Sequence, residues 1–259
     1  PRRLSVTEIE TWMRNPYAVF ARHVLKLRAL APLDEDPSAA ERGRLIHRVL
    51  ERFGQAFPQA LGPDAAVVLA RIVEQELTAA AVRPGLTLIW GPRLRRIAEW
   101  VLAEEQRRRP ALAEVLVETR GRADRLERLA TGGVRVVDYK TGQAPNQREV
   151  LQGVSPQLSL EAAMVAAGGF PGGAAPVAGL EFWRLTGGLD EPGRVLPVDR
   201  GQPAEQLAAE AEAGLRALIA AFDDPATPYL AWPRAEHPPR FDDYAHLARI
   251  DEWAKGSGE

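Results

Sequence analysis

Cysteine is absent from the 259 residues of the chain. Disulfides, thiolate zinc sites and cysteine-ligated iron–sulfur clusters are therefore excluded, and any bound metal must be held by oxygen or imidazole ligands. Apolar runs of the roughly 20 residues needed to cross a bilayer are also absent, as is a signal-peptide pattern. We therefore expect a cytoplasmic protein that does not enter the membrane. Because the chain begins with Pro1 and a capped helix follows closely, we also expect a fragment of a longer protein.

Lysine is scarce in this sequence. Lysine and arginine together number 33, but lysine stands only at positions 26, 140 and 255. The formal net charge is -2, so a DNA-binding surface would have to be a local patch of arginine. Arginines cluster within residues 42–52, 93–96 and 107–109. Each cluster, taken alone, is better interpreted as the solvated face of a helix.

Helical periodicity dominates the first hundred residues. Ser5 and Glu8 fit a capping box at the start of a short helix. Apolar residues at helical spacing then predict helices over residues 39–57, 65–81 and 93–108, with the last two separated by Pro84-Gly85 and Gly91-Pro92. Further helices are predicted over residues 156–167 and 204–222.

Alternating side chains replace the helical pattern after residue 110. Residues 115–124 and 134–139 predict two strands of a hairpin that turns at residues 131–133, and residues 176–185 predict an apolar strand. The sequence therefore predicts a single α/β domain over residues 1–259. It would have a mainly helical part (1–110), a sheet core with the active site (111–200) and C-terminal helices (201–259).

A pair of charged residues on the second strand of the hairpin suggests chemistry. Asp138 and Lys140 are two residues apart, so their side chains share one face of the sheet, while Tyr139 points to the other. Folding the hairpin places residue 125 or 126 opposite Asp138, with Asp124 one or two positions away. Paired carboxylates in a chain without thiols suit a hard ion such as Mg²⁺ or Mn²⁺. The alternative is a solvated Asp–Lys pair at a strand end.

Lys140 stands where this chain would ordinarily use arginine. Its compact ammonium could orient or help deprotonate an attacking water, or neutralise charge that develops on a phosphate. His47 shares one stripe of its helix with Gly43 and Glu51, where a neutral imidazole could add a metal ligand. A hydrogen-bonded histidine that binds no metal is the more common role for such a residue.

Four motifs occur in order along the chain. They are Gly43-Arg44-Leu45-Ile46-His47-Arg48-Val49-Leu50-Glu51, Gly121-Arg122-Ala123-Asp124-Arg125, Asp138-Tyr139-Lys140-Thr141-Gly142 and Pro156-Gln157-Leu158. They resemble the G-x-x-x-H-x-x-L-E, G-x-x-D-R, D-Y-K-T-G and Q motifs of RecB-like nucleases in the PD-(D/E)XK superfamily. The two ends of the chain extend the resemblance to the C-terminal nuclease domains of the AddB family of double-strand-break repair subunits, in its alphaproteobacterial form.

The resemblance implies a restriction-endonuclease-like core, in which helices flank a central mixed sheet, and it implies a set of site residues. His47, Asp124, Asp138 and the Tyr139 carbonyl would bind Mg²⁺, for which Mn²⁺ could substitute, while Lys140 would be the catalytic lysine and Gln157 a positioning group. The resemblance also implies an exonuclease that hydrolyses phosphodiesters of single-stranded DNA unwound with an AddA-like helicase–nuclease partner.

The chain departs from these relatives in two places. Many relatives hold a [4Fe–4S] cluster on four cysteines, but Asn15 stands at the first of these positions and the C-terminal cysteines are missing, so no iron–sulfur cluster is expected. Contacts of Tyr244, Leu247 and Trp253 with the N-terminal helices would have to replace it. The second departure is Glu161, where the Q motif usually ends in tyrosine.

Two other functions are compatible with the sequence. A catalytically silent DNA-binding or scaffold module would keep the fold with a broken motif, whereas here the motif residues are intact. A stand-alone RecB-type exonuclease would share the chemistry without the helicase partner. No G-x-x-x-x-G-K-[ST] phosphate loop occurs, so ATP hydrolysis would belong to other segments or to a partner.

Overall fold

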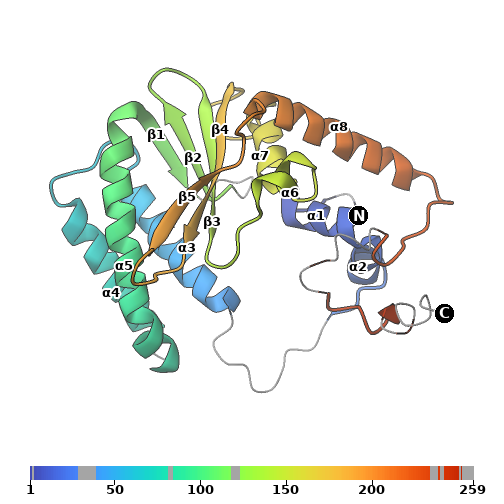
Figure 1. Ribbon diagram of the computed structural model, residues 1–259, viewed down its shortest axis with the longest axis horizontal. Coiled ribbons are helices and arrows are strands. Elements are labelled where there is room, and N and C mark those ends of the chain that lie inside the picture. The colour runs from blue at the N-terminus through green and yellow to red at the C-terminus, as the bar shows by residue number, and fades with distance from the viewer. Residues whose placement is uncertain are drawn as a thin grey trace.

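A mixed sheet forms the centre of the computed structural model (Figure 1), which describes residues 1, 3–28, 39–80, 84–117, 123–233, 239, 242–250 and 252. The strands in this part of the chain are β1 (Leu112–Val117), β2 (Arg125–Leu129), β3 (Val134–Lys140), β4 (Val177–Leu185) and β5 (Gly193–Pro197), in this order across the sheet. β3 and β4 are parallel, and the other neighbours are antiparallel.

Helices cover both faces of this sheet (Figure 1). They are α1 (Val6–Arg14), α2 (Pro16–Val19), the π-helical turn η1 (Phe20–Val24), α3 (Ala39–Ala56), α4 (Ala65–Ala79), α5 (Pro84–Arg108), the 3₁₀ turn η2 (Arg109–Ala111), α6 (Gln147–Leu151), α7 (Gln157–Ala166) and α8 (Ala204–Asp223). α3, α4 and α5 pack on one face, and α7 and α8 on the other. The predicted α/β fold is confirmed. Among the described helices, none has the length and apolarity to cross a bilayer.

Strand β3 contributes to both hydrophobic clusters because its side chains alternate between the two faces. Val137 and Tyr139 enter the cluster under α3, α4 and α5, whereas Val134 and Val136 enter the cluster under α7 and α8. Asp138 has the same parity as Val134 and Val136, so its carboxylate lies on the α7 side. On this face of β3 the row of apolar side chains therefore ends at Val136, and the charged Asp138 and Lys140 follow it.

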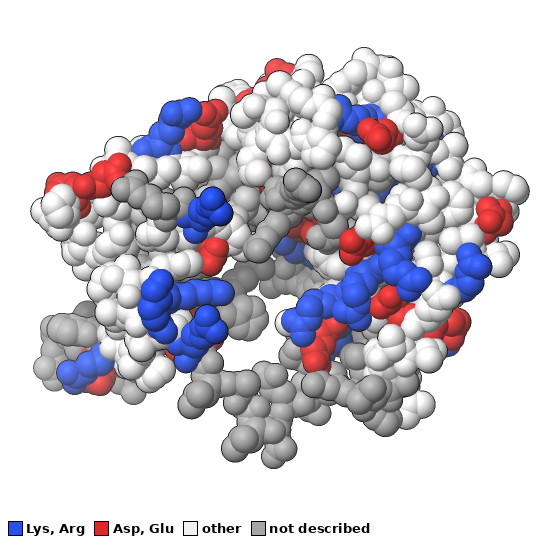
Figure 2. Space-filling view, turned by 180° about the vertical axis from the view of Figure 1, so that it is seen from behind, with Lys and Arg blue, Asp and Glu red and all other residues white. Residues whose placement is uncertain are grey.

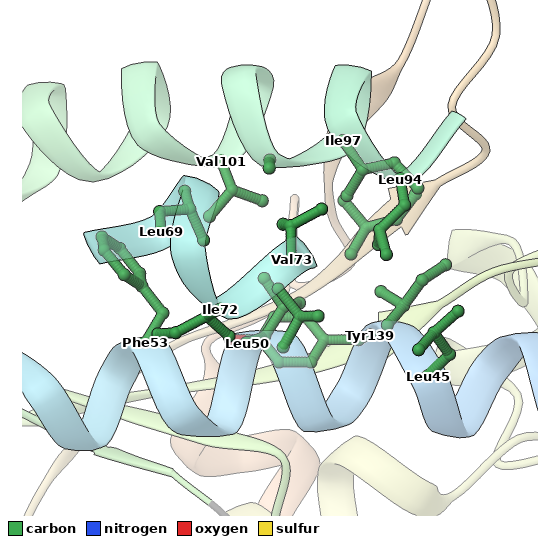
Figure 3. Close-up of a cluster of buried hydrophobic side chains, with 14 of the residues drawn as sticks. Leu45, Leu50, Phe53, Leu69, Ile72, Val73, Leu94, Ile97, Val101 and Tyr139 are labelled. Atoms are coloured by element: carbon green, nitrogen blue, oxygen red, sulfur yellow. The ribbon is translucent and has the colours of Figure 1, made fainter. Parts of the chain in front are cut away.

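The larger cluster holds the N-terminal helices against the sheet. Figure 3 shows Tyr139 reaching from β3 into a layer of side chains from three helices, namely Leu45, Leu50 and Phe53 of α3, Leu69, Ile72 and Val73 of α4, and Leu94, Ile97 and Val101 of α5. Burying each such side chain contributes about 1.5–3 kcal/mol. The apolar stripe predicted for residues 39–57 is thus the face of α3 that packs on the sheet.

The prediction of one strand over residues 115–124 was wrong in its boundaries. β1 ends at Val117, residues 118–122 lie outside the described part of the chain, and the hairpin partner of β3 is β2. Both faces of β2 are buried, with Leu126 on one and the charged Arg125 and Glu127 on the other, so the strand has no simple polar–apolar alternation. The register is also shifted, because Arg125 pairs with Val137 and not with Asp138.

One helix boundary and two short elements also differ from expectation. α5 begins at Pro84 and continues through Pro92, although the sequence predicted a break there. Proline is well tolerated in the first turn of a helix, which suits Pro84, but Pro92 removes one backbone hydrogen bond from the interior. The short elements α6 and β5 were not predicted, because five residues carry too little periodicity to be recognised.

A network of buried ion pairs lies between the C-terminal end of α5 and the sheet. Arg125 is 2% exposed and contacts Glu105 and Glu127, and Arg108 Nη1 lies 2.5 Å from Glu181 Oε1 and 3.1 Å from Glu127 Oε2. Burial alone would raise the pKa of Glu105 and Glu127, but the neighbouring guanidinium groups more than offset it, and both pKa values lie below 4.5. Both carboxylates therefore stay ionised.

Asp242 connects the C-terminal segment to the N-terminal helices through hydrogen bonds. Its Oδ2 accepts hydrogen bonds from Asn15 Nδ2 at 2.9 Å and Trp232 Nε1 at 2.7 Å, and its Oδ1 accepts from the Tyr244 backbone at 2.9 Å. Tyr244 packs on Ala18 and Ala21 of α2 and η1. The packing expected of Tyr244 is confirmed. The packing expected of Leu247 is not, since its side chain is 47% exposed, and Trp253 lies outside the described residues.

Replacing Asp242 by alanine should lower the melting temperature by several degrees. Asn15 is 1% exposed, and a buried amide left without a partner costs about 1–3 kcal/mol, with each kcal/mol worth about 2–4 °C in a domain of this size. Differential scanning calorimetry of Asp242→Ala against the exposed control Asp243→Ala measures this. Equal melting temperatures for the two variants would contradict the role given to Asp242.

Acid should destabilise the protein through Glu105 and Glu127. Carboxylates with lowered folded pKa values contribute stability that is fully present above the unfolded value, near 4.5, and is lost as the pH falls through the folded value. Urea unfolding at a series of pH values should show this loss. Glu105→Gln should cost about 3–5 kcal/mol at neutral pH and flatten the acid slope, whereas the exposed control Glu212→Gln should do neither.

Candidate active site

A cleft of about 430 Å³ brings together residues from five parts of the chain. It is lined by Ser5, Val6 and Thr7 at the start of α1, His47 of α3, Asp124 before β2, Asp138, Tyr139 and Lys140 of β3, and Gln157 and Glu161 of α7. All six site residues proposed from the sequence lie here. Of the motif residues, Gly121 and Arg122 are outside the described part of the chain.

Asp138, Lys140 and Gln157 form a closed triangle of contacts. Lys140 Nζ lies 2.8 Å from Asp138 Oδ2 and donates to Gln157 Oε1 at 2.9 Å. Gln157 Nε2 in turn donates to Asp138 Oδ1 at 2.5 Å. Lysine and glutamine therefore hold both oxygens of the buried aspartate, and the aspartate fixes the position of the ammonium group.

Asp124 links the sheet to helix α3. Its Oδ2 accepts a hydrogen bond from the Tyr139 backbone at 2.8 Å, and its Oδ1 lies 3.4 Å from His47 Nδ1. Continuing the pairing of Arg125 with Val137 by one residue places Asp124 opposite Asp138. The two carboxylates therefore approach each other as predicted, and Asp124 lies opposite Asp138 where the expected register left it one or two positions away.

The His47 motif reaches the end of β3 because α3 passes close to it. The His47 ring meets the Tyr139 ring edge-on, with centroids 5.6 Å apart, and a methyl group added at Gly43 would lie 3.5 Å from Thr141 Oγ1. The Tyr139 ring lies in the cluster of Figure 3, as its parity on the strand predicts. Glu51, on the same stripe as His47, does not line the cleft and accepts a hydrogen bond from Gln55.

The cleft carries more negative than positive charge. Burial, reinforced by Asp124, raises the pKa of Asp138 to about 6, although Lys140 and His47 oppose the shift. Burial followed by the charges of Asp138 and Asp124 also raises the pKa of Glu161 well above its ordinary value. Burial lowers the pKa of Lys140, but Asp138 more than offsets this and the net shift is upward. Lys140 is therefore an ammonium group among three acids.

Glu161 is the site residue that the sequence reasoning missed. It was noted only as a departure from a motif, yet its carboxylate is 1% exposed and receives a hydrogen bond from Gln157 Nε2 at 3.2 Å. The spacing from Gln157 could have revealed it, because residues four apart on a helix share one face.

The donor types in the cleft fit a hard divalent cation. Carboxylate oxygens, a backbone carbonyl and an imidazole are ligands that Mg²⁺ and Mn²⁺ accept, and the site has a surplus of acids to neutralise. Within the described residues, no three His, Asp or Glu side chains converge on one point as a closed metal site. Here the N–H groups of Lys140 and Gln157 hold the oxygens of Asp138, so cation binding would have to exchange these partners.

Most of the arginine clusters seen in the sequence are used within the fold. Arg48 and Arg52 pair with Glu76, Arg95 pairs with Glu74, and Arg109 is buried against Glu105. A second, basic cleft of about 690 Å³ is lined in part by Arg22, His23, Lys26 and Arg28. Figure 2 shows basic side chains on both sides of a hollow in the face of the molecule opposite to that of Figure 1.

Asp124, just before β2, and Asp138 and Lys140 of the neighbouring β3 are the acids and the lysine expected of a nuclease with a mixed α/β fold. Comparison with protein families agrees, because the model of the PD-(D/E)XK nuclease superfamily matches residues 3–235. The chain belongs to this superfamily.

Two individual relatives show how similar the chain is to known proteins. The chain is 30% identical to an uncharacterized protein of Rickettsia bellii over 185 residues, which are 66% of this chain and 22% of that protein. It is 27% identical over 172 residues to an ATP-dependent helicase/deoxyribonuclease subunit of Streptococcus equi subsp. zooepidemicus, and the match covers 61% of this chain and 16% of that protein. The chain thus spans about a fifth of the length of these curated relatives.

The contacts of Lys140 predict how its ammonium group titrates. In the wild-type chain its pKa should lie above the ordinary 10.5, and Asp138→Asn should lower it, because Asp138 is the main group that offsets burial. Carbon-13 NMR of reductively methylated protein can follow this, since the chain has few lysines. The signal of the exposed Lys26 is the internal control, and an unchanged Lys140 signal would contradict the ion pair.

Proposed function

We propose that this chain is a divalent-metal-dependent deoxyribonuclease domain that works as an exonuclease on single-stranded DNA. The observation that carries the proposal is the triangle of Asp138, Lys140 and Gln157, with Asp124 on the neighbouring strand. A buried acid paired with a lysine in a polar cleft lowers the stability of the fold. Such arrangements are concentrated at functional sites. Membership of the nuclease superfamily gives the reaction class.

The residues divide into ligands and groups that act on the substrate. His47, Asp124, Asp138 and the Tyr139 carbonyl are the proposed ligands of Mg²⁺, with Mn²⁺ as a substitute. When bound, the cation would polarise the scissile phosphate as a Lewis acid.

Lys140 is the proposed catalytic lysine. Its ammonium group would orient or help deprotonate an attacking water, or neutralise charge that builds up on the phosphate. Gln157 is a positioning group in this scheme, because its carbonyl oxygen accepts from Lys140 while its amide holds Asp138.

The proposed substrate and partner follow from the relatives. The streptococcal protein that matches 61% of this chain is named as part of an ATP-dependent helicase/deoxyribonuclease, and this sequence has no phosphate loop of its own. We therefore propose an AddB-type nuclease domain that receives unwound single strands from an AddA-like helicase–nuclease partner during double-strand-break repair. The basic cleft around Arg22 and Lys26 supports contact with phosphates without base recognition.

Two alternatives make different predictions. A catalytically silent DNA-binding or scaffold module would bind DNA without cleaving it, even with its partner. A stand-alone RecB-type exonuclease would cleave DNA but would not co-purify with a helicase chain. The intact set of His47, Asp124, Asp138 and Lys140 in one cleft favours cleavage over the silent module.

A nuclease assay on end-labelled single-stranded DNA tests the proposal. Degradation should require Mg²⁺ or Mn²⁺ and should fall by at least about 100-fold in Asp138→Ala and Lys140→Ala, the range in which loss of a positioned catalytic group lies. The exposed control Asp190→Ala should keep wild-type activity. Activity that survives in Lys140→Ala would sink the assigned role, and no cleavage with or without the helicase partner would establish the silent module.

A further inference from the structure

Glu161 is a carboxylate for which the proposed mechanism has no use. It lies on α7 one turn after Gln157, lines the same cleft as Asp124 and Asp138, and is 1% exposed. Its Oε1 accepts a hydrogen bond from Gln157 Nε2, but its Oε2 is buried and receives no hydrogen bond from any described residue. A buried carboxylate oxygen without a partner is costly, so the surroundings must supply one in the working protein.

The contacts of the Gln157 amide indicate that a partner for Glu161 Oε2 would lie between Glu161 and Asp138. Its nitrogen lies 2.5 Å from Asp138 Oδ1 and 3.2 Å from Glu161 Oε1, so one neutral donor serves two acids. Asp138 Oδ2 faces the ammonium group of Lys140, with Nζ 2.8 Å away. The Gln157 amide therefore lies between the two carboxylates, and no described residue donates to Glu161 Oε2. Divalent cations bind carboxylate oxygens, so a cation held here would supply the partner that Glu161 Oε2 lacks.

We propose that Glu161 and Asp138 together bind a divalent cation in this cleft, so that the site is built from three carboxylates where the motifs provide two. The inference rests on the proposed function and adds a ligand to it. Gln157 has a second role in this scheme, since its amide holds the two acids in place until the cation replaces it. Asp124 and His47 line the same cleft and complete the set of donors.

Isothermal titration calorimetry with Mn²⁺ alone, without DNA, separates the possibilities. Glutamine has the shape of glutamate without its charge, so Glu161→Gln should weaken Mn²⁺ binding by at least about tenfold, the scale of loss expected when a ligand or its support is removed. Asp138→Asn should weaken binding as well, and the exposed control Asp190→Asn should not. Glu161→Asp keeps a carboxylate and should fall between wild type and Glu161→Gln. Melting curves show which variants are folded, and if Glu161→Gln does not fold, the comparison rests on Glu161→Asp.

The outcomes distinguish the inference from the proposed function. Wild-type Mn²⁺ affinity in Glu161→Gln, together with loss in Asp138→Asn, would overturn the role of Glu161 and leave the nuclease proposal standing. If the wild-type chain binds no Mn²⁺ at all, both the added ligand and the metal-dependent mechanism are wrong. Weakened binding in both variants, with the Asp190→Asn control unchanged, supports the three-carboxylate site.

Discussion

The placement of every functional group depends on strand β3 being buried on both faces. Its odd-numbered residues, Val137 and Tyr139, anchor the helices α3, α4 and α5, and its even-numbered residues pack under α7 and α8. The even row runs from the valines into Asp138 and Lys140, which contact Gln157 of α7. β3 thus contributes side chains to both hydrophobic clusters and to the cleft. A shift of one residue in register would move Asp138 to the opposite face of the sheet.

Charged groups are buried in two places, with opposite consequences. Under the end of α5, Glu105 and Glu127 are surrounded by arginines, and both pKa values are lowered despite burial. In the cleft, burial and the charge of Asp124 raise the pKa of Asp138 to about 6, although Lys140 and His47 oppose the shift. Burial is similar in the two places, so the balance of partners decides the direction. The first arrangement stabilises the fold, and the second is the one on which the proposed cation site depends.

The sequence predicted the parts of this structure that depend on periodicity and missed those that depend on tertiary contacts. The apolar stripes of α3, α4 and α8 and the parity of Asp138 and Lys140 follow from spacing alone. The break expected at Pro92 did not occur, because packing of α5 on the sheet outweighs one lost hydrogen bond. β2 was missed because the charged Arg125 and Glu127 are typical of an exposed segment, and their buried ion-pair partners on α5 and β3 are not visible in the sequence. Glu161 was overlooked for the same reason, since its importance depends on what faces it.

The choice of lysine at position 140 follows from the size of the space that it fills. Where this chain buries arginine, as at Arg125, the planar guanidinium spreads its donors over two carboxylates and lies 4.8 Å from the centre of the Trp183 ring. Beside Asp138 a single nitrogen must contact one carboxylate oxygen at 2.8 Å and one amide oxygen at 2.9 Å, and still face the cleft. A compact ammonium group on a flexible stem meets that requirement, whereas the planar fork of arginine is suited to paired acceptors such as those around Arg125. This geometry accounts for a lysine here in a chain that otherwise uses arginine.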